Sequence, residues 1–258
     1  GFWAERGGFK ANVLSKEKIG HVHFVWRGKN PDDLFAFFEK NKQKFFSATE
    51  SLTANMRKRG GGIMDLRIKD KTDLEPNFYQ LEGTFNTVDS MGANFINSLL
   101  EEFSKVLEQE ISTAEELEQE DRSVEIIMCI LSNFTPNCLV RAEVSCPVDS
   151  LAMEGVTGEE FVQKFINAIK VAEIEPYRAV THNKGIMNGI DSVILATGND
   201  FRAVEACVHA YASKDGKYTS LSHANVKDGN FSFWIEVPIS VGTVGGITKL
   251  HPMVKFAH

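Results

Sequence analysis

Apolar residues recur at every second position in short runs of the first half of the chain, and at helical spacing between those runs. The alternation predicts strands over 22–26, 64–68, 79–88 and 124–131. Asn30-Pro31 combines an N-cap with a proline at the first helical position, and the apolar face that follows predicts a helix to about residue 51. A second helix is expected to open at 89–94, with its apolar face at Ile96, Leu99, Phe103 and Val106.

The resulting order, βαββαβ, is the ferredoxin-like arrangement of an antiparallel sheet with two helices on one face. The fold class is therefore α+β. The acidic stretch 108–121 lies between the second helix and the last strand, and a solvated helix extension or loop is expected there.

The pattern changes after residue 131. A strand is expected over 139–145, and a capping box of Thr157 and Glu160 predicts a helix that ends before Pro176. Further helices are expected at about 185–196 and 199–213. Paired strands are expected within 217–239, with Asp228-Gly229-Asn230 as their turn.

Composition excludes several classes of function. The net charge of −7 argues against a nucleic-acid surface, and the sheet lacks the aromatic signature of RNA-binding modules. We expect no membrane span, because no apolar run approaches about 18–20 residues, and no signal peptide. The four cysteines show no CxxC spacing, which is typical of reduced thiols in a cytoplasmic protein rather than of a zinc site.

Residues 177–200 carry the clearest candidate chemistry. Arg178, Asn183, Lys184, Asn188 and Asp200 punctuate small and apolar residues, and three glycines lie among them, at 185, 189 and 198. Glycine lets a ligand approach the backbone closely. An ammonium with little bulk around it can stabilise negative charge on a carbonyl oxygen. The plain alternatives are an exposed lysine at 184 and a helix N-cap at 200.

This segment closely resembles the catalytic segment of the bacterial and archaeal type of 3-hydroxy-3-methylglutaryl-CoA (HMG-CoA) reductases, usually called class II. The similarity continues through residues 201–212. It implies that Lys184 polarises the thioester or aldehyde oxygen and that Asp200 hydrogen-bonds this lysine and a catalytic glutamate. It also implies that Arg178 and Thr181 hold the carboxylate of the substrate.

The resemblance extends to other parts of the site. Asn188, one turn after Lys184, is expected to share its helical face and orient the reacting groups. Asn133 matches a further active-site asparagine of the family, with a turn residue as its alternative. Residues 89–94 resemble the second cofactor signature of the family, Asp-Ala-Met-Gly-Ala-Asn, with serine at 90. The resemblance implies that four matching positions contact the cofactor: Asp89, Met91, Gly92 and Asn94.

Gly242–Gly246 lacks the spacing of the usual dinucleotide fingerprint, so the ferredoxin-like domain is the candidate cofactor domain. Members that prefer NADH carry an acidic residue in the turn near 49–62, where this chain has Thr53 followed by Arg57, Lys58 and Arg59. Cations suit a 2′-phosphate, so NADPH is favoured and NADH remains possible. A solvated basic turn is the alternative.

The resemblance implies a domain organisation and an assembly. Residues 13–132 form the small cofactor-binding domain, inserted between residues 1–12 and 133–258 of a partial, mixed α/β large domain that binds substrate and CoA. The catalytic glutamate and the histidine that protonates CoA lie outside the chain, which is expected to be a fragment that is nearly inactive by itself. A homodimer or higher oligomer with the site at its interface is expected.

Three hypotheses remain. The first is a fragment of an active reductase that converts HMG-CoA to mevalonate and CoA. The second is a non-catalytic CoA- or nucleotide-binding relative, and the third is a ferredoxin-like interaction or RNA-binding module. No metal is expected, because His21 and His23 share a strand face without an apparent third ligand.

Overall fold

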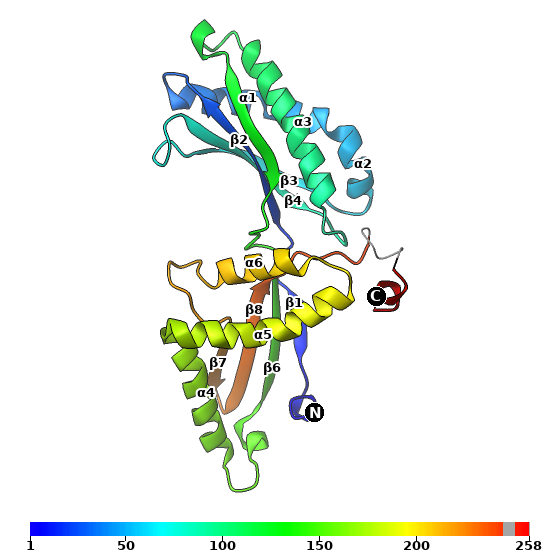
Figure 1. The fold of residues 1–258 in the computed structure, drawn as a ribbon, viewed down its shortest axis with the longest axis vertical. Coiled ribbons are helices and arrows are strands. Elements are labelled where there is room, and N and C mark those ends of the chain that lie inside the picture. The colour runs from blue at the N-terminus through cyan, green and yellow to red at the C-terminus, as the bar shows by residue number, and fades with distance from the viewer. Residues whose placement is uncertain (245–250, 258) are drawn as a thin grey trace. The chain divides into compact units, whose positions relative to one another are not determined.

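The computed structural model describes residues 1–244 and 251–257. It divides into two compact units, Lys16–Ser132 and a unit made of Gly1–Ser15 with Asn133–His258 (Figure 1). The first of these units begins three residues later than the predicted start at 13. Strand β1 (Lys10–Val13) pairs with β6 (Leu139–Pro147), and the amides of Leu14 and Ser15 donate to the carbonyl of Leu139. These hydrogen bonds attach residues 10–15 to the other unit.

The unit Lys16–Ser132 has the predicted ferredoxin-like order with one added helix. Its antiparallel sheet has the strand order β3-β4-β2-β5 (Figure 1). The strands are β2 (Lys18–Trp26), β3 (Gly62–Asp70), β4 (Phe78–Asn86) and β5 (Val124–Leu131). The helices are α1 (Pro31–Ala48), α2 (Glu50–Lys58) and α3 (Ala93–Ser112), followed by a 3₁₀ turn, Gln119–Asp121.

Alternation along β2 builds the core of this unit. Every second residue of the strand is buried, and Val22, Phe24 and Trp26 are fully inaccessible. These side chains pack with residues of α1 and α3, including Phe45 and Phe103. The helices therefore cover one face of the sheet, as predicted.

Two details differ from the sequence prediction. Met64 is 53% exposed because a bulge between Ile63 and Asp65 shifts the register of β3 against β4. The acidic stretch 108–121 is not simply solvated, since Leu117 is buried in the core and the Trp26 indole donates to the carbonyl of Asp121 over 2.8 Å. Apolar residues spaced among the charges anchor this stretch.

The second unit contains a four-stranded antiparallel sheet of order β1-β6-β8-β7 (Figure 1). Its further strands are β7 (Ser222–Lys227) and β8 (Asn230–Pro238), joined by a two-residue turn in which Asp228 and Gly229 both have positive φ. The helices are α4 (Gly158–Ile174), α5 (Pro176–Ala196), α6 (Phe201–Tyr211) and α7 (Pro252–Ala257). Short 3₁₀ turns span Ala4–Arg6 and Val148–Leu151.

Local signals explain the helices that cover this sheet. The Thr157 hydroxyl accepts the amide hydrogen of Glu160, so the predicted N-cap of α4 is confirmed. Phe165 of α4 packs on Phe231 of β8, and Val208 of α6 belongs to the cluster around Val237. None of the helices within the described ranges is long and apolar enough to cross a membrane. The sequence analysis found no dinucleotide fingerprint in Gly242–Gly246. Gly245 and Gly246 of this stretch lie outside the described residues.

Candidate active site

Helix α5 carries four of the predicted site residues. It begins at Pro176, nine residues before the expected start, because the Glu175 carboxylate caps the Arg178 amide over 2.8 Å and proline suits the first turn. Arg178, Thr181, Lys184 and Asn188 are thus three or four residues apart on one helix, and all four are exposed. Residues at this spacing share a face.

This face of α5 is open around the lysine. Among the described residues, none makes a hydrogen bond or ion pair with the Lys184 side chain. A Cβ built on Gly185 or Gly189 would meet nothing within 4 Å. Glycine inside a helix costs about 1 kcal/mol relative to alanine, and packing against the described residues gives no reason for either glycine. The helix surface beside Lys184 is accessible to a ligand or to another chain.

The opposite side of α5 is anchored to the loop before β7. Asn183 is fully buried, its amide nitrogen donates to the carbonyl of Thr219, and its amide oxygen accepts the Leu221 N–H, over 2.9 and 3.0 Å. His182 lies 2.6 Å from the Ser222 hydroxyl, and burial, with the Arg178 charge, lowers the pKa of its imidazole. The sequence groups Asn183 with the site residues. In the structure it lies on the buried side of α5 and fixes the orientation of the helix.

Asp200 is the N-cap of α6. Its carboxylate accepts the amide hydrogens of Arg202 and Ala203 and forms an ion pair of 2.9 Å with the Arg202 guanidinium. The hydrogen bond from Arg202 holds the pKa of this carboxyl below its usual range, so it stays ionised near neutral pH. The carboxylate is exposed and can accept a further proton or hydrogen bond.

The hydrogen bond between Lys184 and Asp200 that the resemblance implied is not formed within one chain. Helix α5 continues for twelve residues beyond Lys184, to Ala196, a rise of about 18 Å. Asp200 uses its carboxylate on its own helix, as described above. Asn133, the other asparagine predicted for the site, is exposed in the loop between β5 and β6.

The predicted cofactor segment 89–94 lies at the start of α3 in the other unit. Gly92 is the N-cap, with φ of +87°, and no side chain caps the helix there. The N-terminal amides and dipole of a 20-residue helix favour a phosphate at this position. Asp89 and Asn94 are exposed, and Met91 is half-buried.

Lys18 was not among the predicted residues, yet it contacts this segment directly. Its ammonium donates to the Thr87 hydroxyl and to the carbonyls of Ser90 and Met91, at 2.7 to 2.9 Å. Lys18 occupies the position in β2 that continues the alternation of Val22, Phe24 and Trp26. That phase is the sequence signal that predicts its burial.

Most of the region 49–62, where a turn is predicted, is helix α2. The helix determines which residues of this region are accessible to distinguish NADPH from NADH. Thr53 is only 4% exposed, and its hydroxyl donates to the carbonyls of Thr49 and Glu50. The role of Thr53 at the coenzyme stays a prediction, and its hydroxyl is already hydrogen-bonded inside the helix. Arg57 is exposed beside Glu50, and Arg59 lies 3.3 Å from Asp89. The basic end of α2 therefore lies next to the 89–94 segment.

The two histidines of β2 interact with side chains of the neighbouring strand β4. His21 lies 3.3 Å from Glu82, and His23 lies 3.2 Å from the amide of Gln80. Burial lowers the pKa of both rings, and Glu82 opposes that shift at His21. In the part of the chain that the structure describes, no three histidine, cysteine or acidic side chains are arranged to hold a metal ion.

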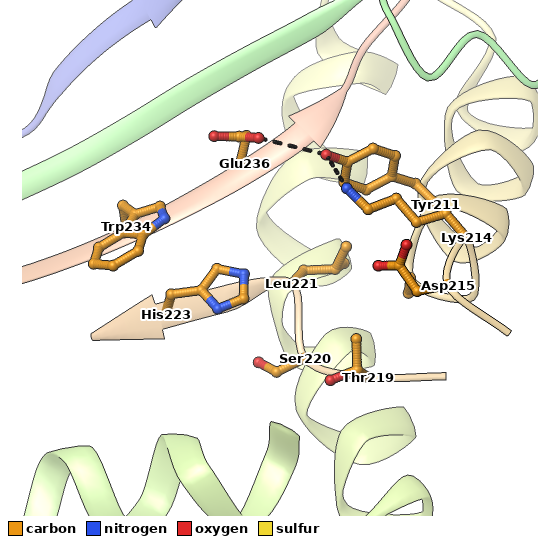
Figure 2. A pocket seen from close by; sticks show the side chains of 10 residues that line it. Tyr211, Lys214, Asp215, Thr219, Ser220, Leu221, His223, Trp234 and Glu236 are labelled. Atoms are coloured by element: carbon orange, nitrogen blue, oxygen red, sulfur yellow. Dashed lines mark hydrogen bonds between the residues drawn. The ribbon is translucent and has the colours of Figure 1, made fainter. Parts of the chain in front are cut away.

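A cavity of about 310 Å³ lies between the end of α6 and strands β7 and β8 (Figure 2). Figure 2 shows Lys214 donating to the Tyr211 hydroxyl, which in turn donates to Glu236, while His223 and Trp234 form another wall. None of the predicted site residues lines this cavity. Lys184, on the open face of α5, and Asp200, at the start of α6, both lie outside this pocket.

Comparison with known proteins identifies the family. The family model described as hydroxymethylglutaryl-coenzyme A reductase matches residues 1–258. The 3-hydroxy-3-methylglutaryl-coenzyme A reductase of Archaeoglobus fulgidus is 29% identical over 253 residues, which are 98% of this chain and 54% of that protein. A probable reductase of the same name from Borreliella burgdorferi is 34% identical over 223 residues, 86% of this chain and 49% of that protein.

Comparison with solved structures points to the same family. The 3-hydroxy-3-methylglutaryl-coenzyme A reductase of Streptococcus pneumoniae matches with a TM-score of 0.86 at 33% identity, over 100% of this chain and 66% of that one. A second structure from that organism, a class II reductase bound to NADPH in open conformations, has the same TM-score at 34% identity and is covered to 59%. The chain spans about half the length of the curated relatives it matches. With a family model that covers all its residues and the fold of solved class II reductases, this chain belongs to the hydroxymethylglutaryl-coenzyme A reductase family.

Proposed function

We propose that the protein carrying this chain reduces HMG-CoA to mevalonate and CoA, using two NAD(P)H and two protons per turnover. The observation that carries the proposal is the exposed face of α5, where Arg178, Thr181, Lys184 and Asn188 flank helical glycines with open space. Membership of the reductase family supports the same reaction.

The chemistry of each side chain fits a step of this reaction. The Arg178 guanidinium can pair bidentately with the terminal carboxylate of the substrate. Lys184 stabilises the oxyanion that forms at the thioester carbon, and later the oxygen of the intermediate aldehyde. Asn188, one turn along, orients the reacting carbonyl. When bound, the nicotinamide supplies the hydrides.

The cofactor site proposed here is the start of α3 with the basic end of α2. The helix N-terminus favours the pyrophosphate, and Arg57, Lys58 and Arg59 favour the additional 2′-phosphate of NADPH. The S. pneumoniae structure bound to NADPH supports this choice of coenzyme.

An assay of the full-length protein tests the reaction and the coenzyme together. We expect NADPH oxidation that depends on HMG-CoA, with two NADPH consumed per CoA released. The ratio kcat/KM should be at least as high for NADPH as for NADH. A preference for NADH above about tenfold, some 1.4 kcal/mol of transition-state binding, would contradict the role of the basic cluster. Binding of both ligands without turnover would instead identify a non-catalytic relative.

We also propose that two copies pair through α5. Apolar side chains are exposed along it, notably Tyr177 at 87%, Val193 at 60% and Leu195 at 55%. Large apolar side chains exposed along a helix suit an interface with another chain. Two-fold pairing brings the C-terminal end of one α5 toward the N-terminal half of the other. In such a pair, Asp200 of one copy lies close to Lys184 of the other. The two residues can then interact although they are far apart within one chain.

The variant Val193→Glu tests this assembly. A charge placed in a buried apolar interface is expected to shift the full-length protein from dimer to monomer in sedimentation velocity at micromolar concentration, with loss of turnover. Leu74→Glu is the matched control, because Leu74 is 73% exposed in the other unit and should leave the dimer intact. A monomer that keeps full activity at nanomolar concentration rules out a shared site.

A further inference from the structure

Lys18 is a buried ammonium at the first position of β2. Only 5% of the residue is exposed, and its Nζ donates to the Thr87 hydroxyl at 2.7 Å and to the carbonyls of Ser90 and Met91 at 2.8 and 2.9 Å. Removing an ammonium from water is costly unless hydrogen bonds replace the lost hydration. These contacts join the start of β2 to a loop about seventy residues away in sequence, which makes them long-range and specific.

The loop that receives these bonds is held in an unusual conformation. Val88 has φ of +52°, which is rare for a β-branched residue, and its amide is bonded to the Asn86 side chain over 2.9 Å. The Thr87 hydroxyl donates to the Ser90 carbonyl over 2.7 Å while it accepts from Lys18. Gly92 could not carry a side chain, since a Cβ there would lie 2.4 Å from Thr87. The chain is therefore constrained from several directions just before α3.

The constraint lies directly behind the helix N-terminus. The first hydrogen bond of α3 runs from the Ile96 amide to the Gly92 carbonyl, over 2.9 Å, and no side chain caps the turn. The amides of residues 93–95 therefore have no partner within the helix. Because Lys18 holds the Ser90 and Met91 carbonyls inside the domain, the peptide planes that lead into these amides are fixed. Its positive charge also raises the potential beneath them.

We propose that Lys18 is a positioning residue for the dinucleotide: acting with the Thr87 hydroxyl, it pre-forms the 87–92 loop that binds the pyrophosphate. The inference rests on the proposed function, since it takes the start of α3 as the cofactor site. Lys18 itself does not touch the dinucleotide. Its effect is to remove the cost of ordering the loop when the coenzyme binds.

The test uses Lys18→Met and Thr87→Val in the full-length protein. Lys18→Met removes the ammonium, and Thr87→Val removes the hydroxyl while it keeps the shape of the side chain. We expect the Kd for NADPH, measured by fluorescence titration, to rise about tenfold in Lys18→Met, as loss of charge-assisted hydrogen bonds implies, and about threefold in Thr87→Val. The KM for HMG-CoA should stay within about twofold, because the substrate residues are on α5.

Two control variants separate positioning from general effects. Thr87→Ser keeps the hydroxyl and should bind NADPH like the wild type. Lys105→Met removes an exposed lysine of α3 that pairs with Glu102, and should leave the Kd unchanged. Circular dichroism and thermal unfolding establish that each variant is folded; if Lys18→Met does not fold, Thr87→Val against Thr87→Ser decides.

The outcomes are distinguishable. Failure of the wild type to bind NADPH overturns the proposed function whatever the variants do. Wild-type binding with an unchanged Kd in folded Lys18→Met or Thr87→Val overturns the positioning role. A loss shared equally between NADPH and HMG-CoA, in step with a lowered Tm, would show that Lys18 only stabilises the fold.

Discussion

Replacing Lys184 by alanine in the full-length protein is expected to lower kcat by about a hundred- to a thousandfold, as the loss of one preorganised charge at an oxyanion does. The stability should hardly change, because Lys184 is exposed and has no hydrogen bond or ion pair with a described residue. Exposed substitutions away from special features usually fall within about 0.5 kcal/mol. A large loss of turnover without loss of stability is therefore the signature of a catalytic lysine.

Steady-state kinetics with saturating NADPH, together with thermal unfolding, measures this prediction. Because the lysine acts on charge that develops in the transition state, kcat and kcat/KM should fall together, with little change in the KM for HMG-CoA. Lys170→Ala is the matched control, since Lys170 is an exposed lysine of the adjacent helix α4. Near-normal turnover in Lys184→Ala would remove the residue from the mechanism.

Replacing Asp200 by asparagine is expected to lower turnover by about a hundredfold or more while α6 stays capped. Asparagine caps a helix about as well as aspartate, so the bonds to the Arg202 and Ala203 amides can be kept. The carboxylate is lost, and with it a group for proton transfer, whose typical contribution is about 10²- to 10⁴-fold. The substitution thus separates catalysis from capping, the two roles that the sequence left open.

The pH dependence follows from the sign of the pKa shift at Asp200. Arg202 lowers the pKa of the folded carboxyl, so its contribution to stability is present above the unfolded pKa and is lost as the pH falls through the lowered folded pKa. Asp200→Asn should lack this acid-range loss, because it lacks the contribution of the ionised carboxylate; it should be somewhat less stable than the wild type near neutral pH and approach it in acid. Unfolding curves across that range, with Arg202→Ala as the control that keeps the carboxylate, measure it. Full turnover in Asp200→Asn would leave Asp200 as a cap alone.

Much of the candidate site was predictable from the sequence because its signals are local. The spacing of Arg178, Thr181, Lys184 and Asn188 follows helical periodicity, so the residues share a face once the helix forms. The capping position of Asp200 was also visible, since it immediately precedes an apolar helical run. The start of α5 was missed because glycines and asparagines weaken the helical pattern, while Glu175 and Pro176 set the true beginning.

What the sequence by itself determined is the order of strands and helices in each unit. The alternation in β2, the Asn30-Pro31 start of α1 and the Thr157 cap of α4 each depend on residues a few positions apart. Such short-range patterns record which face of an element is apolar and where it begins. They do not record which distant groups meet.

Only the tertiary structure decided the contacts between segments far apart in the chain. It buried Lys18 beneath the 87–92 loop, used Asn183 to hold the chain at 219–221, and left Lys184 and Asp200 unpaired with each other. The tertiary structure also exposes Met64 at a bulge in β3. It buries Thr53, whose hydroxyl is hydrogen-bonded to the Thr49 carbonyl. Each outcome depends on hydrogen bonds or packing with a partner that local spacing does not specify, because a buried polar group takes whichever partner the fold brings within reach.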